Sequence, residues 1–133
     1  VLGEVDTLDN NAVTRVILCS GKVYYDLLAA RREQQLNHIA IVRIEQLYPF
    51  PARELSAILA RYPKLARVTW VQEEPANMGA WNFVHGKLHR ILRDRAQLRH
   101  IARPPSPSPA SGSSAVHDRE QEQLFTDAFA DLT

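Results

Sequence analysis

The sequence predicts an α/β domain of three layers, in which helices cover both faces of a mostly parallel sheet. Short apolar runs rich in β-branched residues recur at positions 13–19, 39–44 and 68–72, as expected of strands buried on both faces. A segment with apolar residues at helical spacing follows each run. Strands that alternate with helices in this way favour parallel pairing through right-handed crossovers. The 133 residues, 45% apolar and 23% charged, suit one such domain.

The first strand and helix follow a turn-rich beginning. Residues 1–12 are mixed in composition and are predicted to form an N-terminal linker, so that the single domain spans 13–133. After the strand at 13–19, a helix is predicted at 23–36. Ser20 carries the hydroxyl that a helix N-cap needs, and it is predicted to cap this helix.

The second and third units repeat this pattern. The strand at 39–44 leads to a helix with Pro51 at its first position, where the missing N–H costs nothing. Pro75 lacks the N–H that a sheet ladder uses, so the third strand is predicted to end before it. Asn77 is then predicted to cap a third helix at 76–93.

The last part of the chain changes composition twice. A shorter fourth strand is predicted at 98–102. Residues 103–115 form a Pro/Ser-rich segment, which alone is typical of a linker. Helical spacing resumes at 116–132, so this segment is predicted to carry a C-terminal helix across the body of the domain.

Composition excludes several classes of function. The formal net charge is +1, with 16 basic and 15 acidic residues, and neither nucleic acid nor membrane is predicted as a partner. No apolar stretch approaches the length of a membrane span. The single cysteine, Cys19, cannot form an intrachain disulfide, which fits a reducing compartment. The chain begins at Val1 rather than at methionine, and we expect it to be a processed product or a piece of a larger protein.

Polar residues gather where two of the predicted strands end. Glu73 and Glu74 follow the third strand, where a carboxylate can act as an acid or base, although an anchor or interface contact is the favoured interpretation. Strand alternation is expected to send their side chains to opposite faces. Ser20, Gly21 and Lys22 join the first strand to its helix and could bind an anion there, with helix capping as the favoured alternative.

Other candidate chemistry is weaker. His85 and His89 have the spacing of two zinc ligands, but no third ligand accompanies them. No motif supplies a nucleophile with its base and oxyanion donors, and no phosphate-loop signature is present. The sequence therefore predicts no catalytic residue, no cofactor-binding residue and no metal ligand within this chain.

Four motifs in a fixed order carry a resemblance to a known family. The motifs are RVILCSGKVYYDL (15–27), IAIVRIEQLYPFP (39–51), WVQEEPANMGAW (70–81) and RPPSPSPASGSSAVHDREQEQLF (103–125). With these motifs the chain resembles the C-terminal, transketolase-like domain of the thiamine-diphosphate-dependent component of 2-oxoglutarate dehydrogenase complexes. The related 2-oxoadipate dehydrogenase component shares much of the pattern.

The resemblance implies a reaction for the parent protein. Thiamine diphosphate, bound with Mg²⁺, attacks 2-oxoglutarate, CO₂ leaves, and a succinyl group passes to a lipoyl carrier. The cofactor and the catalytic residues of that family lie in preceding domains. The implied partners are those domains, a second copy in a homodimer, and the lipoyl succinyltransferase of the complex. The implied location is the cytoplasm of a bacterium or the mitochondrial matrix of a eukaryote.

The resemblance also implies a role for the strand ends. Some members of the family respond to a nucleotide or acyl-CoA effector, and the positions that match an acetyl-CoA site include Ser20, Lys22 and Gln72. Glu73, Glu74 and Trp81 are candidates for an interface with the rest of the parent.

Two hypotheses follow from these observations. The chain is either the non-catalytic domain of a 2-oxo acid dehydrogenase or a free-standing module that binds a nucleotide or acyl-CoA. A domain cut from a larger enzyme should expose a large apolar patch. The aromatic residues predicted to form such a patch are Trp81, Phe83, Phe125 and Phe129.

Overall fold

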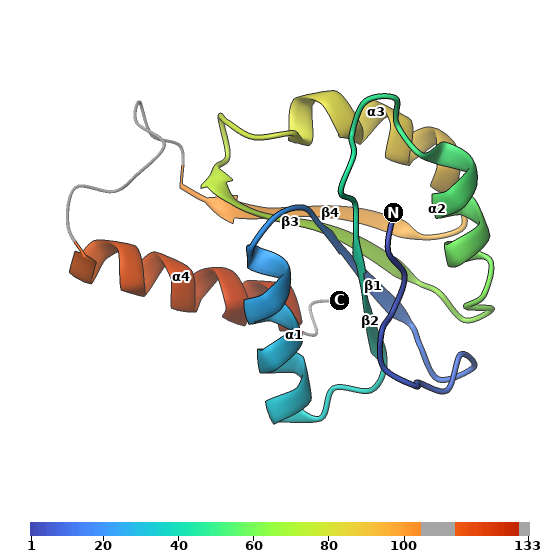
Figure 1. Cartoon of the computed structure of the whole chain (residues 1–133), viewed down its shortest axis with the longest axis horizontal. Coiled ribbons are helices and arrows are strands. Elements are labelled where there is room, and N and C mark those ends of the chain that lie inside the picture. Colours follow the sequence, from blue (N-terminus) through green and yellow to red (C-terminus); the bar gives the residue numbers. More distant parts are fainter. Residues whose placement is uncertain (105–113, 131–133) are drawn as a thin grey trace.

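The computed structural model describes residues 1–104 and 114–130. Its eight elements alternate between strand and helix along the chain (Figure 1). They are β1 (Arg15–Cys19), α1 (Val23–Gln34), β2 (Ile39–Arg43), α2 (Ala52–Leu59), β3 (Arg67–Pro75), α3 (Trp81–Leu92), β4 (Gln97–Arg103) and α4 (Ser114–Phe129).

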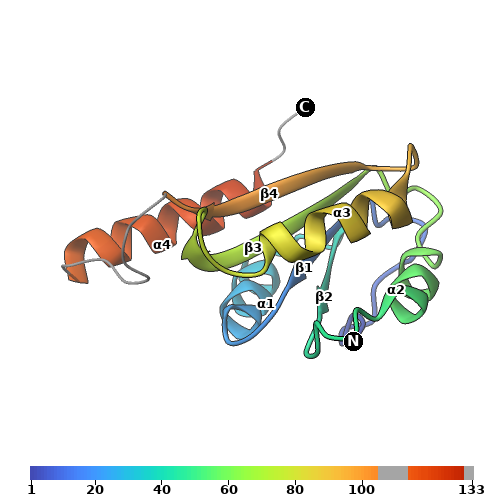
Figure 2. The same ribbon diagram turned by 90° about the horizontal axis from the view of Figure 1, so that it is seen from above.

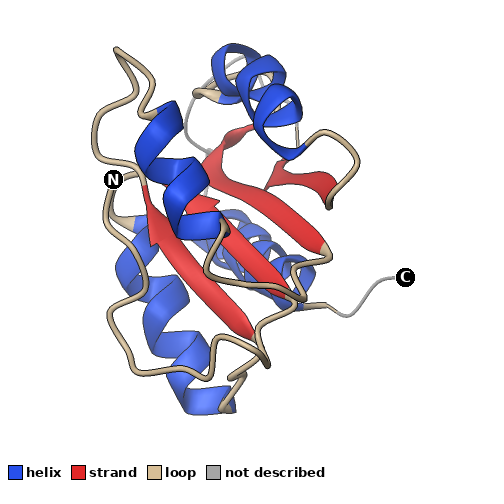
Figure 3. Cartoon of the chain, turned by 90° about the vertical axis from the view of Figure 1, so that its right-hand side faces the viewer, coloured by secondary structure: helices blue, strands red, loops and turns tan. Residues whose placement is uncertain are grey.

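The four strands form one sheet in the order β2-β1-β3-β4, and every pair is parallel. Helices lie on both sides of the strands (Figure 3). One apolar core joins the sheet to α2 and α3, and the other joins it to α1 and α4. The predicted three-layer α/β architecture is confirmed.

β1 lies at the centre of the sheet, and all five of its residues are buried. Its side chains alternate between the two cores, with Val16 and Leu18 in one and Ile17 and Cys19 in the other. The chain passes from β1 to β2 on one side and then crosses to β3 on the other. The strand order therefore reverses between β1 and β3, and in open α/β sheets ligands bind beyond the carboxyl ends of such strands.

The predicted start of the third helix was wrong. β3 continues to Pro75, which pairs with Arg103 after a register shift that begins at Val71. A proline is tolerated at such an irregularity because the regular ladder is already interrupted. Gly79 then has φ +80°, a conformation that no residue of a right-handed helix adopts. α3 consequently begins at Trp81, and its N-cap position is Ala80 rather than Asn77.

The predicted cap of the first helix was also wrong. Lys22, not Ser20, occupies the N-cap position of α1, and no side chain caps the helix there. Gly21, with φ +80°, separates Ser20 from the helix. At the other end, Gln35 adopts a left-handed conformation with φ 54° and ends the helix before the predicted residue 36. Pro51 similarly lies one position before α2, at its N-cap.

The predicted N-terminal linker is held against the outer edge of β2. Leu2 and Arg43 exchange backbone hydrogen bonds of 2.8 and 2.9 Å. The carboxylate of Glu4 accepts the N–H of Ile41 at 2.7 Å and forms an ion pair with the buried guanidinium of Arg31. Arg31 also pairs with Asp6. The segment is therefore fixed to the domain by backbone and ionic contacts together.

α4 is anchored at both ends by arginines of the sheet. Near its beginning, Arg103 donates to the ring of His117 at 2.8 Å and to the side chain of Gln121. At its other end, Arg15 donates to the carbonyl oxygen of Ala128 at 3.0 Å. The helix begins at Ser114 and ends at Phe129, inside the predicted limits at its C-terminal end. The predicted segment 103–115 lies largely outside the described residues.

Within the described ranges, none of the helices combines the length and the apolar character that crossing a bilayer requires.

Candidate effector site at the carboxyl ends of two strands

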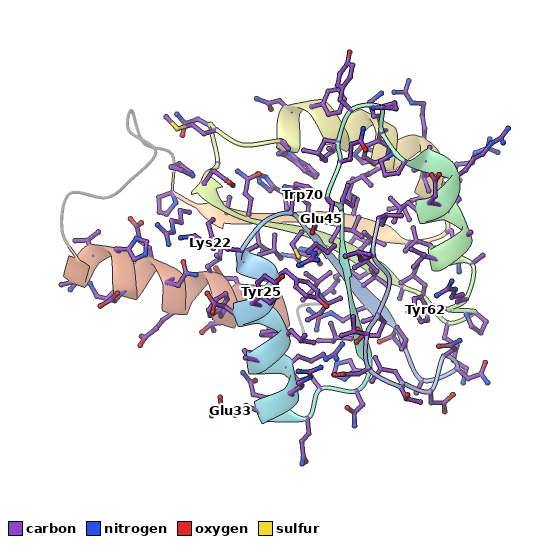
Figure 4. All side chains as sticks on the ribbon, viewed as in Figure 1. Lys22, Tyr25, Glu33, Glu45, Tyr62 and Trp70 are labelled. Atoms are coloured by element: carbon purple, nitrogen blue, oxygen red, sulfur yellow. The ribbon has the colours of Figure 1, made fainter. Side chains whose placement is uncertain are left out.

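A small hollow lies at the carboxyl ends of β1 and β3, where the strand order reverses. It has a volume of about 100 Å³. The turn after β1 forms one wall and the end of β3 the other; the lining residues are Ser20, Gly21, Lys22, Val23, Glu73 and Glu74. We call the edge of the sheet formed by the carboxyl ends of the strands the crest. Lys22 lies at the end of α1 that faces the crest, whereas Glu33 lies at the opposite end (Figure 4). The two predicted groups of polar residues thus meet at one place.

The turn after β1 has open space above Gly21. At Gly21, a side chain would meet no atom within 4 Å, so the space above the turn is open. The Lys22 side chain is exposed, and it forms no ion pair within 4.0 Å with a carboxylate of the described residues. The hollow therefore offers one ammonium group as well as hydrogen-bond acceptors from Glu73 and Glu74.

Glu73 and Glu74 both border the hollow, and the expectation that their side chains leave opposite faces of β3 stays a prediction. The register shift between Val71 and Pro75 falls at these two positions. Glu73 is half-buried and Glu74 is exposed. Two neighbouring carboxylates favour a ligand that brings hydroxyl or amino donors as well as an anionic group for Lys22.

Gln72 lies next to the hollow but is turned toward the loop that follows β3. Its side chain is 3% exposed. The amide nitrogen donates to the carbonyl oxygens of Pro75 at 3.0 Å and Met78 at 2.7 Å, while the amide oxygen accepts the indole N–H of Trp70 at 3.0 Å. Gly79 packs against this amide, since a Cβ there would lie 3.0 Å from its nitrogen. Gln72 thus positions the segment that carries Glu73 and Glu74.

Trp81, the third interface candidate, does not line this hollow. Its ring stacks on His100 of β4, with centroids 4.4 Å apart and planes 12° from parallel. Burial lowers the pKa of His100. The indole of Trp81 is half-buried by contacts within this chain.

The remaining titratable candidates show no assembled chemistry. The rings of His85 and His89 meet edge to face at 6.5 Å. In the ranges that the structure describes, no three histidine, cysteine or acidic side chains gather in a way that could hold a metal ion. Burial raises the pKa of the Cys19 thiol to about 12, which keeps it protonated and unreactive at neutral pH.

Sequence reasoning missed a second polar cluster on the same crest. The guanidinium of Arg43, at the carboxyl end of β2, lies 4.7 Å from the ring centre of Tyr24 and donates to the hydroxyl of Tyr25 at 2.8 Å. Glu45 forms an ion pair with the same guanidinium. The signal in the sequence was the tyrosine pair in the first turn of the helix, of which Tyr24 is buried and Tyr25 exposed. This cluster extends the polar surface from Lys22 toward β2.

The fold and the crest define a class of protein. The chain is a parallel α/β domain with a small polar hollow at its topological switch point. Comparison with known families is consistent with this fold. The 2-oxoglutarate dehydrogenase C-terminal family matches residues 1–129, and the chain belongs to this family.

Individual relatives carry consistent names. The chain is 51% identical over 130 residues to the 2-oxoglutarate dehydrogenase E1 component of Coxiella burnetii, with 96% of this chain and 14% of that protein covered. It is 48% identical to the corresponding component of Azotobacter vinelandii, with 97% of this chain and 14% of the relative covered. It is 44% identical to the 2-oxoglutarate dehydrogenase E1 component of Cupriavidus necator, with 99% of this chain and 14% of that protein covered. The chain therefore spans about one seventh of the length of these relatives.

Proposed function

We propose that this chain is the C-terminal domain of a 2-oxoglutarate dehydrogenase E1 component. The parent protein would decarboxylate 2-oxoglutarate and pass the succinyl group to a lipoyl carrier. The observation that carries this proposal is the family match over residues 1–129, together with the three relatives described above, which bear this name. Those names favour 2-oxoglutarate over 2-oxoadipate as the substrate.

We place the cofactor outside this domain. Thiamine diphosphate supplies the group that attacks the 2-oxo carbon, and it is held with Mg²⁺. Among the described residues, no cluster of metal-ligating side chains fits that ion. The relatives are about seven times longer than their match to this chain, which leaves room for dedicated cofactor-binding domains. In this proposal the present domain supports those domains and the homodimer they form with a second copy.

The lipoyl succinyltransferase of the complex is a further proposed partner, because the succinyl group must reach its lipoyl arm. The named relatives are bacterial proteins. We therefore propose the bacterial cytoplasm as the compartment, where the free thiol of Cys19 would remain reduced.

A substrate test on the full-length parent separates the two dehydrogenases. Purified parent protein, loaded with thiamine diphosphate and Mg²⁺, should release CO₂ from 2-oxoglutarate faster than from 2-oxoadipate. Faster release from 2-oxoadipate would move the protein to the related component, and no release from either would reject the assignment.

We further propose that the hollow at the ends of β1 and β3 binds an anionic effector, either a nucleotide or an acyl-CoA. Lys22 would hold a phosphate, with Ser20 beside it, and Glu73 or Glu74 would accept hydrogen bonds from ribose hydroxyls or from the adenine amino group. Gln72, which matches the family position, would act by holding the wall of the hollow through its bonds to the following loop.

A binding measurement tests the effector proposal. At 100 times its dissociation constant, a ligand that binds only the folded state adds about 2.7 kcal/mol of stability. Acetyl-CoA and AMP should each be tested by thermal unfolding. Lys22→Ala should abolish the shift, whereas Lys64→Ala, at an exposed lysine before β3, should retain it. No shift with either ligand would leave the domain with a structural role alone.

A further inference from the structure

An aromatic cluster on the opposite side of the sheet from α1 is unused by the proposed function. Tyr48 lies between β2 and α2 and is 78% exposed, and Phe83 of α3 is 37% exposed. Their rings stack with centroids 5.3 Å apart. Phe50 completes the cluster, which we call the aromatic ridge (Tyr48, Pro49, Phe50 and Phe83). This ridge differs from the predicted patch, since Phe125 and Phe129 are half-buried against the core under α1 and α4.

The ridge is held in place before any partner arrives. The Lys87 ammonium lies 5.0 Å from the ring centre of Phe83 and 6.0 Å from that of Phe50. Phe50 also packs against the core formed with α2 and α3. Large exposed aromatic side chains with fixed orientation are typical anchors of protein interfaces, because they bury much apolar area at little cost in conformational entropy.

Hollows flank the ridge on two sides. The larger, about 610 Å³, lies between the start of α2 and the last turns of α3, with Lys87 and Arg90 at its rim. The smaller, about 270 Å³, is lined by the first residue of the chain, Val1, together with Gln46, Pro49, Phe50, Pro51 and Glu54. Ridge and hollows together form a surface able to receive side chains from another structure.

The first residue of the chain has a fixed position beside this surface. The two backbone hydrogen bonds between Leu2 and Arg43 set the direction in which the chain approaches Val1. Gly3 lies beside α2, since a Cβ there would be 3.6 Å from the side chain of Ile58, an ordinary contact distance. In Figures 1 and 2 the N-terminus lies beside α2. Any polypeptide that precedes Val1 must therefore leave the domain next to Phe50.

We propose that the aromatic ridge docks the part of the parent chain that precedes Val1. This inference rests on the proposed function, in which the chain is the C-terminal seventh of a longer protein. A segment tethered at Val1 reaches the ridge at high effective concentration, so it needs no separate affinity of its own. The docked surface would be apolar, to cover Tyr48 and Phe83, and would carry acidic groups opposite Lys87 and Arg90.

Site-directed photo-cross-linking in the full-length parent tests this docking. Tyr48→benzoylphenylalanine keeps an aromatic ring at the most exposed position of the ridge. Illumination should produce a cross-linked product that migrates with the mass of one chain under denaturing conditions. Mass spectrometry should assign the partner peptide to sequence before Val1. The matched control is Tyr25→benzoylphenylalanine, an exposed tyrosine on α1 at the other face, which should not label that peptide.

Each other result overturns the proposal. A product with twice the chain mass would mean that a second copy covers the ridge. Cross-linking to added succinyltransferase would make the ridge a contact of the complex, and the absence of any product would mean that it faces solvent. Release of CO₂ from 2-oxoglutarate by the unmodified parent is measured separately, so failure of the docking and failure of the proposed activity are distinguishable.

Discussion

Gln72 shows how one buried side chain can organise a loop at a ligand-binding edge. Its carboxamide joins Trp70 on one side to the carbonyl groups of Pro75 and Met78 on the other. The sequence placed Gln72 in the third strand, but β3 continues past it to Pro75, and the sequence could not reveal that the amide faces inward. That orientation depends on the register shift in β3, for which the sequence gives only Pro75 as a clue.

Replacing this amide should destabilise the domain. Gln72→Met keeps the length of the side chain but removes the hydrogen bonds that the amide makes with the indole N–H of Trp70 and the carbonyl of Met78, while the Pro75 carbonyl keeps the N–H of Met78. Leaving a buried polar group unsatisfied costs about 1–3 kcal/mol. Urea unfolding should show a decrease in the free energy of unfolding of this size. Gln34→Met, at an exposed position of α1, is the control and should change little; equal effects of the two substitutions would contradict this role for Gln72.

Asp6 should make stability depend on pH in acid. The hydrogen bond from Arg32, supported by Arg31, lowers the pKa of Asp6 from 3.8 to about 2. A carboxyl group with a lower pKa in the folded state contributes stability that is complete above its unfolded pKa and is lost as the pH falls toward the folded value. Asp6→Asn should therefore be less stable than the parent sequence at pH 6, and the difference should narrow between pH 4 and pH 2. A stability difference between the two proteins that is constant across this pH range would mean that the ion pairs of Asp6 do not cause it.

At the level of elements, the order and type of helices and strands were predictable, whereas several ends were not. Apolar runs of the right length fix β1, β2 and β3 because each is buried on both faces. The ends of α1 and α3 depend instead on backbone conformation at single residues. Gly21 and Gly79 both have positive φ, and each displaces the start of a helix from the side chain that was predicted to cap it. A glycine in a sequence permits such a conformation without requiring it.

Two glycines around α3 should respond oppositely to the same substitution. Gly86 lies inside α3, where a Cβ would approach only the end of the Arg90 side chain at 4.0 Å, so Gly86→Ala should stabilise the domain by about 0.5–1 kcal/mol. Gly79 has φ +80° and would direct a Cβ against Gln72, so Gly79→Ala should destabilise it by about 1–2 kcal/mol. Thermal unfolding of both variants tests the pair. Shifts in the same direction would show that the loop conformation at Gly79 is not required.

At the level of the whole molecule, the sequence predicted three layers and the meeting of two polar segments at one edge. Parallel topology brings the carboxyl ends of β1 and β3 together, so Ser20, Lys22 and Glu73 could be expected to approach one another. Of the aromatic ridge, only Phe83 was among the residues predicted to form an exposed patch. Tyr48 and Phe83 are 35 positions apart in the numbering and belong to different elements, and no periodic pattern connects them.

The contacts of residues 1–12 have a consequence for how this domain avoids aggregation. An outer strand of a sheet presents free N–H groups that can pair with another molecule. Along β2, the outward N–H of Ile41 bonds to the Glu4 carboxylate and that of Arg43 bonds to Leu2. Leu2 and Glu4 thus occupy these N–H groups, so that a strand of another molecule cannot pair with this edge.

A truncated chain that begins at residue 13 should lose this protection. Removing Glu4 and Asp6 would also leave the Arg31 guanidinium, which is 2% exposed, without its anions. We expect the truncated chain to form oligomers or to precipitate at concentrations where the full 133 residues remain dispersed, as measured by light scattering. Equal light scattering from the two chains would show that residues 1–12 are not needed to protect the edge of β2. If only the truncated chain associates, residues 1–12, which their composition predicts to be a linker, prevent the sheets of neighbouring copies from pairing.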